Sequence, residues 1–148
     1  MALANKECLV SSGEILIKEL DKSKAKLLPV DSEHNAIFQV FETHNKSHLD
    51  RLILTASGGP FRDCSLEEMK EKSPKEALAH PNWNMGNKIS IDSATMMNKG
   101  LEIIEAHYLF GVKESVIDVV IHPQSIVHSL VSYFCLLYTS DAADEVVR

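Results

Sequence analysis

Two acidic side chains, Asp31 and Glu33, flank Ser32 directly after the apolar residues 25–30. Carboxylate oxygens are the ligands that hard divalent cations such as Mg²⁺ and Mn²⁺ prefer. Two carboxylates are a weak signal, because such a site needs a third ligand from elsewhere in the chain. The same residues also suit a helix start, where acidic side chains are favourable. For an isolated Asp-Ser-Glu, helix capping is the commoner explanation.

A second polar group lies between residues 92 and 102. Ser93, Asn98 and Lys99 can all donate to an anion, and Glu102 follows them. If a helix begins near residue 94, Ser93 lies at its N-terminus, where unpaired N–H groups and the helix dipole favour a phosphate. Glu102 would then supply the third carboxylate. The alternative is a surface ion pair between Lys99 and Glu102, which are neighbours on a helix and would add little stability.

A turn at Ser57-Gly58-Gly59 follows a short apolar run. Its backbone N–H groups and the hydroxyl could surround an anion, although an ordinary tight turn explains the same residues equally well. The chain has no Gly-x-Gly-x-x-Gly and no Gly-Lys-Ser/Thr phosphate loop, so it shows no recognisable nucleotide cradle.

Residues 80–86 lack helical or strand periodicity and carry three large side chains, His80, Trp83 and Met85. Such a segment could be a lid over an active site or a loop held on the core by its tryptophan. Five other histidines lack metal-ligand spacing with one another and are expected to be structural or exposed. They are His34, His44, His48, His107 and His128.

The elements that must position these residues follow from the apolar pattern. Apolar residues at positions 97, 101, 104 and 108 predict the strongest helix, over residues 94–110 and ending at Gly111. Other helices are predicted from residue 13 to 20, from the caps at residues 31–32, and from a capping box at residue 65 to residue 72. Strands are predicted at residues 25–30, 52–54, 88–91, 117–121 and 126–133, and a loop at 43–50. The alternation indicates an α/β or α+β domain, and periodicity does not choose between them.

Composition excludes several classes of protein. The 148 residues are 45% hydrophobic and 24% charged with a net charge of −6, as in a globular domain rather than a disordered or collagen-like chain. No basic stripe favours nucleic acid, and no apolar run is long enough to span a membrane. The three scattered cysteines and the absence of a signal-peptide pattern favour a reducing, bacterial-type cytoplasm.

Six longer strings resemble one family in order and spacing. They are ALANKE (2–7), LLPVDSEHNAIFQ (27–39), TASGGPFR (55–62), HPNWNMG (80–86), KISIDSATMMNKGLE (88–102) and IHPQS (121–125). They closely resemble the 1-deoxy-D-xylulose 5-phosphate reductoisomerases, and the resemblance covers residues 2 to about 133. It implies conversion of 1-deoxy-D-xylulose 5-phosphate to 2-C-methyl-D-erythritol 4-phosphate in non-mevalonate isoprenoid biosynthesis, with NADPH and a divalent cation (Mg²⁺, Mn²⁺ or Co²⁺).

The resemblance also implies a role for each matching residue. Metal ligands would be Asp31, Glu33 and Glu102, and catalytic residues Lys6, Glu33 and His80. The substrate would contact Ser32, Ser57, His80, Trp83, Ser93, Asn98 and Lys99, the last three with Ser57 around the phosphate. The nicotinamide cofactor would lie near Asn5, Lys6, Glu7, Met85 and Gly86, and His80, Trp83 and Met85 would belong to a closing loop.

The resemblance further implies a chain truncated at both ends of a Rossmann-containing enzyme. Residues 1–30 would be the end of the NADPH-binding domain, residues 31–133 the catalytic α+β domain, and residues 134–148 a tail foreign to the family. Members of the family are homodimers. We expect the 148 residues alone to be inactive or nearly so. The alternatives are an inert truncated product without a functional site and, more weakly, a metal-dependent phosphosugar hydrolase.

Overall fold

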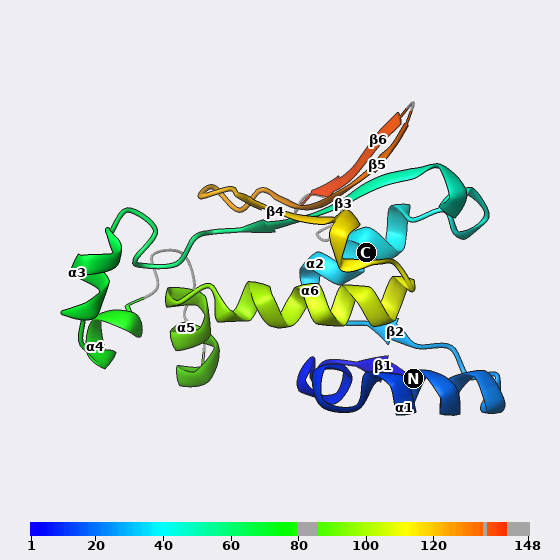
Figure 1. The fold of residues 1–148 in the computed structure, drawn as a ribbon, viewed down its shortest axis with the longest axis horizontal. Helices are drawn as coiled ribbons and strands as arrows, with labels where there is room; N and C mark the ends of the chain where they lie inside the picture. Colours follow the sequence, from blue (N-terminus) through cyan, green and yellow to red (C-terminus); the bar gives the residue numbers. More distant parts are fainter. Residues whose placement is uncertain (80–85, 135, 142–148) are drawn as a thin grey trace.

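The computed structural model describes residues 1–79, 86–134 and 136–141 (Figure 1). For residues 137–141 it describes the backbone. The elements, in order, are β1 (Ala2–Leu3), α1 (Glu7–Ser23), β2 (Leu28–Pro29), α2 (Ser32–Val40), the 3-10 helix η1 (Thr43–His48), β3 (Leu49–Ala56), α3 (Leu66–Lys70), α4 (Pro74–Ala77), α5 (Asn87–Ala94), α6 (Met97–Phe110), the 3-10 helix η2 (Glu114–Val116), β4 (Ile117–Ile121), β5 (Val127–Tyr133) and β6 (Leu136–Asp141). The predicted mixture of helices and strands is confirmed.

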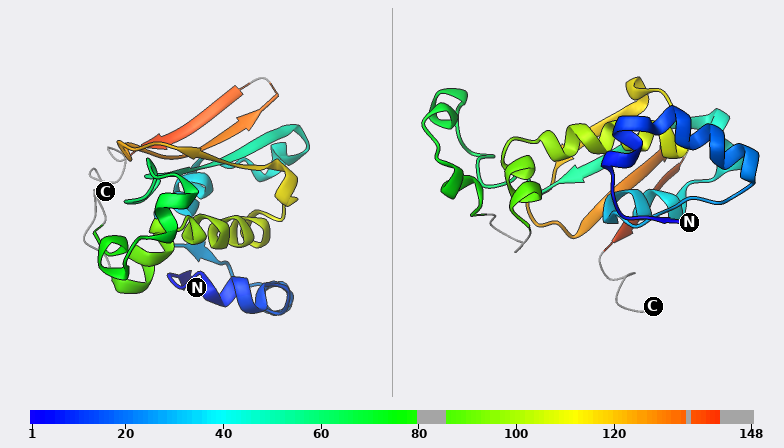
Figure 2. Two further views of the ribbon diagram at one scale, coloured as in Figure 1. Left: turned by 60° about the vertical axis from the view of Figure 1, so that its left-hand side comes forward. Right: turned by 90° about the horizontal axis from the view of Figure 1, so that it is seen from below.

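The elements form layers. A four-stranded sheet of order β4-β3-β5-β6 covers one side, α2 and α6 lie beneath it, and α1 with the short pair β1-β2 lies beneath those helices (Figures 1 and 2). Strand β3 is parallel to β4 and antiparallel to β5, which pairs antiparallel with β6. No helix or strand is predicted for residues 134–148, yet residues 136–141 extend this sheet as β6.

The main core lies between the sheet and α2 and α6. Ile37 of α2 and Phe110 of α6 pack there with Leu52, Leu54 and Val131 of the sheet. Burial of this apolar surface fixes both helices against the sheet. The first turn of α2 and the middle of α6 are thereby held next to each other.

The N-terminal unit is a small βαβ arrangement. Strand β1 runs parallel to β2, with Ala2 opposite Leu28, and α1 connects them. Helix α1 begins at Glu7 rather than at Gly13 as predicted, and it kinks at Ser12, whose φ/ψ angles are not helical. A β-carbon added at Gly13 would lie only 2.4 Å from the ring of Tyr108, so the absent side chain lets α1 approach α6.

Residues 88–91 form part of α5, so the predicted strand is wrong. The long predicted helix is also divided: α5 ends at Ala94, and α6 begins only at Met97, because Met96 adopts a left-handed backbone with φ 60°. A left-handed residue cannot continue an α-helix. Residues 92 and 93 therefore lie inside α5 and do not cap the following helix.

The buried face of α6 also differs from the predicted apolar stripe. Met97 and Ile104 are exposed, whereas Lys99, Glu102 and Glu105 are buried beside Ala106 and Phe110. A helix face that buries charged side chains needs partners for them. Those partners come from α1 and α2.

Candidate metal centre

Three carboxylates from two helices meet where α2 begins. Asp31 is the N-cap of α2 and accepts a hydrogen bond from the Glu33 N–H, and Glu33 lies in the first turn of the same helix. Glu102 reaches them from the buried face of α6. Each of the three offers an oxygen, and these oxygens all lie within 4.8 Å of one another. The capping explanation and the metal-ligand explanation of Asp31 are thus compatible.

Two lysine ammonium groups lie against these carboxylates. Lys6, at the start of α1, contacts Asp31 at 2.8 Å and Glu102 at 3.0 Å. Lys99 contacts Glu33 at 3.3 Å and forms a very short contact with Glu102. Since Lys99 and Glu102 are buried, the alternative of a surface ion pair is wrong.

The charges of this group do not balance. Three carboxylates face two ammonium groups. The uncharged Asn98 amide donates to Glu102 at 2.6 Å and accepts from Lys6 at 2.9 Å, which leaves this imbalance unchanged. Burial, the nearby Glu102 and the nearby Asp31 raise the pKa of Glu33, although Lys99 opposes them. Burial would raise the pKa of Asp31, but its close contacts with His34 and Lys6 and the positive charges of these groups outweigh burial and lower it. A further cation is electrostatically favoured at such a group.

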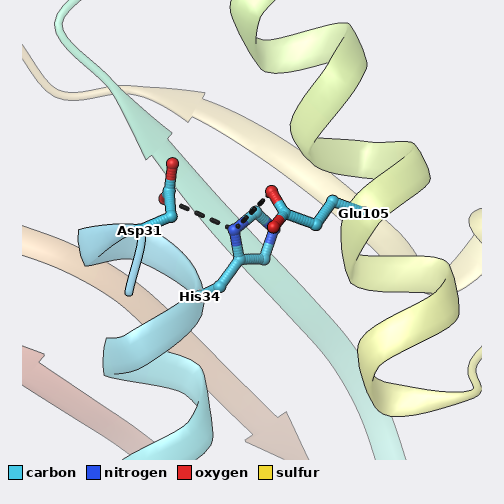
Figure 3. Close-up of side chains that lie close together, drawn as sticks. All are labelled: Asp31, His34 and Glu105. Carbon is cyan, nitrogen blue, oxygen red and sulfur yellow. Dashed lines mark ion pairs between the residues drawn. The ribbon is translucent and has the colours of Figure 1, made fainter. Parts of the chain in front are cut away.

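His34 and Glu105 extend the group inward (Figure 3). The His34 ring nitrogen Nδ1 lies 3.3 Å from Asp31 Oδ1 and 3.2 Å from Glu105 Oε2. Neither contact has the geometry of a hydrogen bond. The other ring nitrogen, Nε2, lies 3.0 Å from the Glu102 carbonyl oxygen, which can only accept, so Nε2 carries a proton. Nδ1 therefore faces two carboxylate oxygens, an arrangement that favours a proton among the three atoms.

The pKa shifts agree with a shared proton. Burial raises the pKa of the Glu105 carboxyl to about 7, against the opposing charge of His34. Burial alone would lower the pKa of His34, but the contact with Asp31 and the charge of Glu105 raise it. From the sequence, His34 is predicted to be structural or exposed, and Glu105 is not among the predicted site residues. The available signal was spacing, because His34 follows Asp31 by three residues and Glu105 follows Glu102 by three.

Two of the predicted phosphate ligands, Ser57 and Ser93, are on neighbouring segments. A β-carbon on Gly59 would lie 2.5 Å from the Ser93 carbonyl oxygen, and Gly59 has φ +66°, so only glycine lets the turn after β3 approach α5 this closely. Ser93 lies near the end of α5, so its predicted place at a helix N-terminus is wrong. Ser32 lies beside the carboxylates, and its hydroxyl donates to Glu33 at 2.8 Å.

The predicted cofactor residues that the structure describes lie around the start of α1. Asn5 accepts a hydrogen bond from the Glu7 N–H, and Glu7 contacts Lys88 of α5 at 2.7 Å. Gly86 is the N-cap of α5, and no atom lies within 4 Å of where its β-carbon would be. The predicted closing-loop residues His80, Trp83 and Met85 lie outside the described residues.

The donor set suits a hard divalent cation. It consists of oxygen atoms from carboxylates that are mostly buried, with an excess of negative charge, and such ions prefer oxygen ligands. Fold and site together therefore define an α/β protein with an acidic centre whose oxygen atoms suit a cation. None of the described helices is long and apolar enough to cross a membrane.

Comparison with known proteins identifies the family. The family model of the 1-deoxy-D-xylulose 5-phosphate reductoisomerase C-terminal domain matches residues 27–110. The reductoisomerase of this name from Rhodospirillum centenum is 63% identical over 133 residues, which cover 90% of this chain and 33% of the relative. That from Clostridium perfringens is 56% identical over 133 residues, which cover 90% of this chain and 35% of the relative. The chain belongs to the 1-deoxy-D-xylulose 5-phosphate reductoisomerase family, and it spans about a third of the length of these relatives.

Solved structures agree with the sequence relatives. The enzyme from Zymomonas mobilis in complex with NADPH superposes with a TM-score of 0.87 at 51% identity, covering 95% of this chain and 36% of that one. A reductoisomerase in complex with NADPH, fosmidomycin and magnesium superposes with a TM-score of 0.89 at 52% identity, covering 95% and 37%. The predicted family is confirmed.

Proposed function

We propose that this chain carries the cation-binding and substrate-binding residues of a 1-deoxy-D-xylulose 5-phosphate reductoisomerase. The reaction would convert 1-deoxy-D-xylulose 5-phosphate to 2-C-methyl-D-erythritol 4-phosphate with NADPH. The observation that carries the proposal is the meeting of Asp31, Glu33 and Glu102 in a chain of this family. A related structure contains magnesium together with NADPH and fosmidomycin, which agrees with this assignment.

Asp31, Glu33 and Glu102 would hold the divalent cation, and Ser32 would contact the substrate beside it. When bound, the cation acts as a Lewis acid toward a carbonyl and a neighbouring hydroxyl. Lys6 would provide a positive charge where oxyanion character develops. Its contacts with Asp31 and Glu102 fix its ammonium group at the edge of the carboxylates.

Ser57, Ser93, Asn98 and Lys99 would bind the phosphate. Hydroxyl, amide and ammonium groups are all donors, and binding energy from the distant phosphate helps to position the reacting carbons. The close approach of Gly59 to Ser93 places the two serine-bearing segments together. His80, Trp83 and Met85 would cover the substrate and exclude water from it.

NADPH would lie near Asn5, Lys6, Glu7, Met85 and Gly86. Residues 1–30 would belong to the NADPH-binding domain and residues 31–133 to the catalytic domain, while residues 134–148 would be foreign to the family. We further propose a homodimer in the bacterial cytoplasm that binds a small sugar phosphate and no nucleic acid or membrane. The start of the matched family model at residue 27 supports the first boundary.

Titration of the purified 148-residue chain with Mn²⁺ tests the proposed centre. Free Mn²⁺, followed by electron paramagnetic resonance, should decrease in a saturable way. A ligand that binds only the folded state at about 100 times its Kd should add roughly 2.7 kcal/mol to the free energy of unfolding. Glu33→Gln should abolish both effects. The matched control is Glu67→Gln on α3, an exposed position that should leave them unchanged.

Three results would contradict the proposal. An absence of saturable Mn²⁺ binding would favour the inert truncated product, and unchanged binding by Glu33→Gln would place the cation elsewhere. Release of inorganic phosphate from sugar phosphates would instead indicate the hydrolase. We expect the 148-residue chain alone not to oxidise NADPH in the presence of substrate.

A further inference from the structure

We propose that His34 and Glu105 form a positioning pair that holds Asp31 in place as a cation ligand. The inference rests on the proposed function, since it assigns a role beside the proposed cation centre. Neither residue belongs to the three carboxylates themselves. Figure 3 shows His34 between Asp31 at the start of α2 and Glu105 of α6.

The two oxygens of Asp31 have different partners. Oδ1 accepts from the Glu33 N–H at 3.2 Å and lies 3.3 Å from His34 Nδ1. Oδ2 lies 2.8 Å from the Lys6 ammonium group, on the side where Glu102 also reaches Lys6. The contacts of Oδ1 fix the plane of the carboxylate. Oδ2 is thereby directed toward the positive charges of the centre.

The His34 ring is itself held from the opposite helix. Its Nε2 donates to the Glu102 carbonyl oxygen at 3.0 Å, its Nδ1 lies 3.2 Å from Glu105, and its ring stacks near Phe110 with centroids 6.4 Å apart. The exposed fraction of His34 is 0% and that of Glu105 is 1%. The ring is held by α6 on one side and touches Asp31 on the other. It thereby connects the Asp31 carboxylate to the backbone of Glu102, which lies 71 residues away in sequence.

Burial makes this arrangement costly for a purely structural contact. Buried polar groups that lack aligned hydrogen bonds destabilise a protein, and His34 Nδ1 and Glu105 Oε2 are two such atoms. Groups that orient metal ligands are a recognised reason for such contacts, and replacing them typically weakens metal binding by about 10- to 100-fold. The pair therefore has the position, the contacts and the burial of a support for Asp31.

The test measures the Kd for Mn²⁺ of the 148-residue chain by electron paramagnetic resonance, with the folded state checked by near-ultraviolet circular dichroism without metal. Glu105→Gln and His34→Gln should each raise the Kd about 10-fold or more. The matched controls are His107→Gln and Glu114→Gln. These two residues form another His–Glu contact at 3.2 Å involving α6, but a more exposed one, and the Kd should not change.

A double-mutant comparison separates positioning from general structure. In a chain that already carries Asp31→Asn, Glu105→Gln should change the Kd much less than it does in the wild type, because its effect passes through Asp31. An equal effect in both backgrounds would overturn the inference. An unchanged Kd in Glu105→Gln would also overturn the inference. The same holds if the wild type binds a second Mn²⁺ ion that this variant no longer binds, since Glu105 would then be a ligand.

Failure of the inference and failure of the proposed function remain distinguishable. If the wild type binds Mn²⁺, Glu33→Gln does not, and Glu105→Gln binds normally, only the inference is wrong. If the wild type binds no Mn²⁺, the proposed function is wrong as well. If both variants fail to fold, NMR of the wild type provides the test. The ring-nitrogen chemical shift of His34 should change when Mg²⁺ is added, while that of His107 should not. An unchanged His34 shift would overturn the inference.

Discussion

Two lysine–glutamate pairs in this protein have the same separation of 3.0 Å in very different surroundings. Lys6 and Glu102 join α1 to α6, and their side chains are 10% and 1% exposed. Lys72 and Glu76 lie four residues apart around the start of α4, and theirs are 32% and 49% exposed. The first pair is part of the candidate centre, and the second surrounds a capping box at Ser73.

The difference shows that distance alone does not reveal what an ion pair contributes. An exposed pair is screened by water and adds little stability. A buried pair is weakly screened, so removing one member leaves a charge without water and without its partner. The exposed pair is also formed by local sequence, whereas the buried one needs α1 and α6 to be packed together. Three substitutions and one titration test this distinction.

The largest effect is expected for Glu102→Gln. Lys6 and Lys99 would each lose a buried carboxylate, and the free energy of unfolding should fall by about 3 kcal/mol. Urea denaturation followed by circular dichroism would measure the loss. Lys72→Met serves as the exposed counterpart and should cause no measurable change. Equal effects of the two substitutions would contradict the distinction.

A smaller effect is expected for Gly13→Ala. In a helix interior this substitution usually stabilises a protein by about 0.5–1 kcal/mol. Here the added methyl group would meet the Tyr108 ring at 2.4 Å, so we expect a destabilisation of about 1–3 kcal/mol instead. The same urea titration gives the sign of the change. Stabilisation would mean that α1 can move away from α6 without loss, and that the place of Lys6 does not depend on this contact.

A change of about 1 kcal/mol is expected for Ser73→Ala. The Ser73 hydroxyl accepts from the Glu76 N–H, and the Glu76 carboxylate accepts from the Ser73 N–H. Removing the hydroxyl breaks one half of this capping box. The affinity for Mn²⁺ should stay unchanged in Ser73→Ala, whereas it should fall in Glu102→Gln. A loss of Mn²⁺ binding in Ser73→Ala would show that the two regions are coupled.

The smallest effect concerns protonation of Glu76. Hydrogen bonds from the Ser73 backbone and hydroxyl, and then from Lys72, lower the pKa of this carboxyl to about 2. Because the folded-state pKa lies below the usual value near 4.5, the carboxylate supports the fold above that pH and loses this effect as the pH falls toward 2. Carbon NMR of the Glu76 carboxyl should follow this titration. Ser73→Ala should move the midpoint upward, and an unchanged midpoint would contradict the assignment.

Local signals predicted much of the fold. The cap at Asp31, the capping box at Ser65, the end of α6 at Gly111 and the strands near residues 117–121 and 126–133 were correct, because each depends on neighbouring residues. The strand at residues 88–91 was wrong, since four residues with two isoleucines fit either periodicity. The left-handed turn at Met96 was not foreseeable either, because methionine has no preference for that conformation.

The candidate site, too, could be predicted from the sequence only in part. Asp31, Glu33 and Glu102 could be singled out by residue type and by resemblance, and the structure brings them together. Their roles as ligands remain a prediction. His34 and Glu105 were missed because neither shows its importance until α2 lies against α6. The apolar repeat of residues 97–108 was also misleading, since partners from other elements let the charged face of α6 become the buried one.

The hydrogen bond between Lys6 and Glu102 joins residues 96 positions apart. During folding, the chain must also close the 71-residue separation between Asp31 and Glu102 before the three carboxylates meet, and the closure entropy has to be met by contacts formed earlier. Helices α2 and α6 themselves form from local contacts, so their secondary structure does not wait for this closure. Capture of Mn²⁺ should consequently lag behind the recovery of secondary structure when the unfolded chain is diluted from urea. Metal uptake would thus mark the moment at which α2 packs against α6.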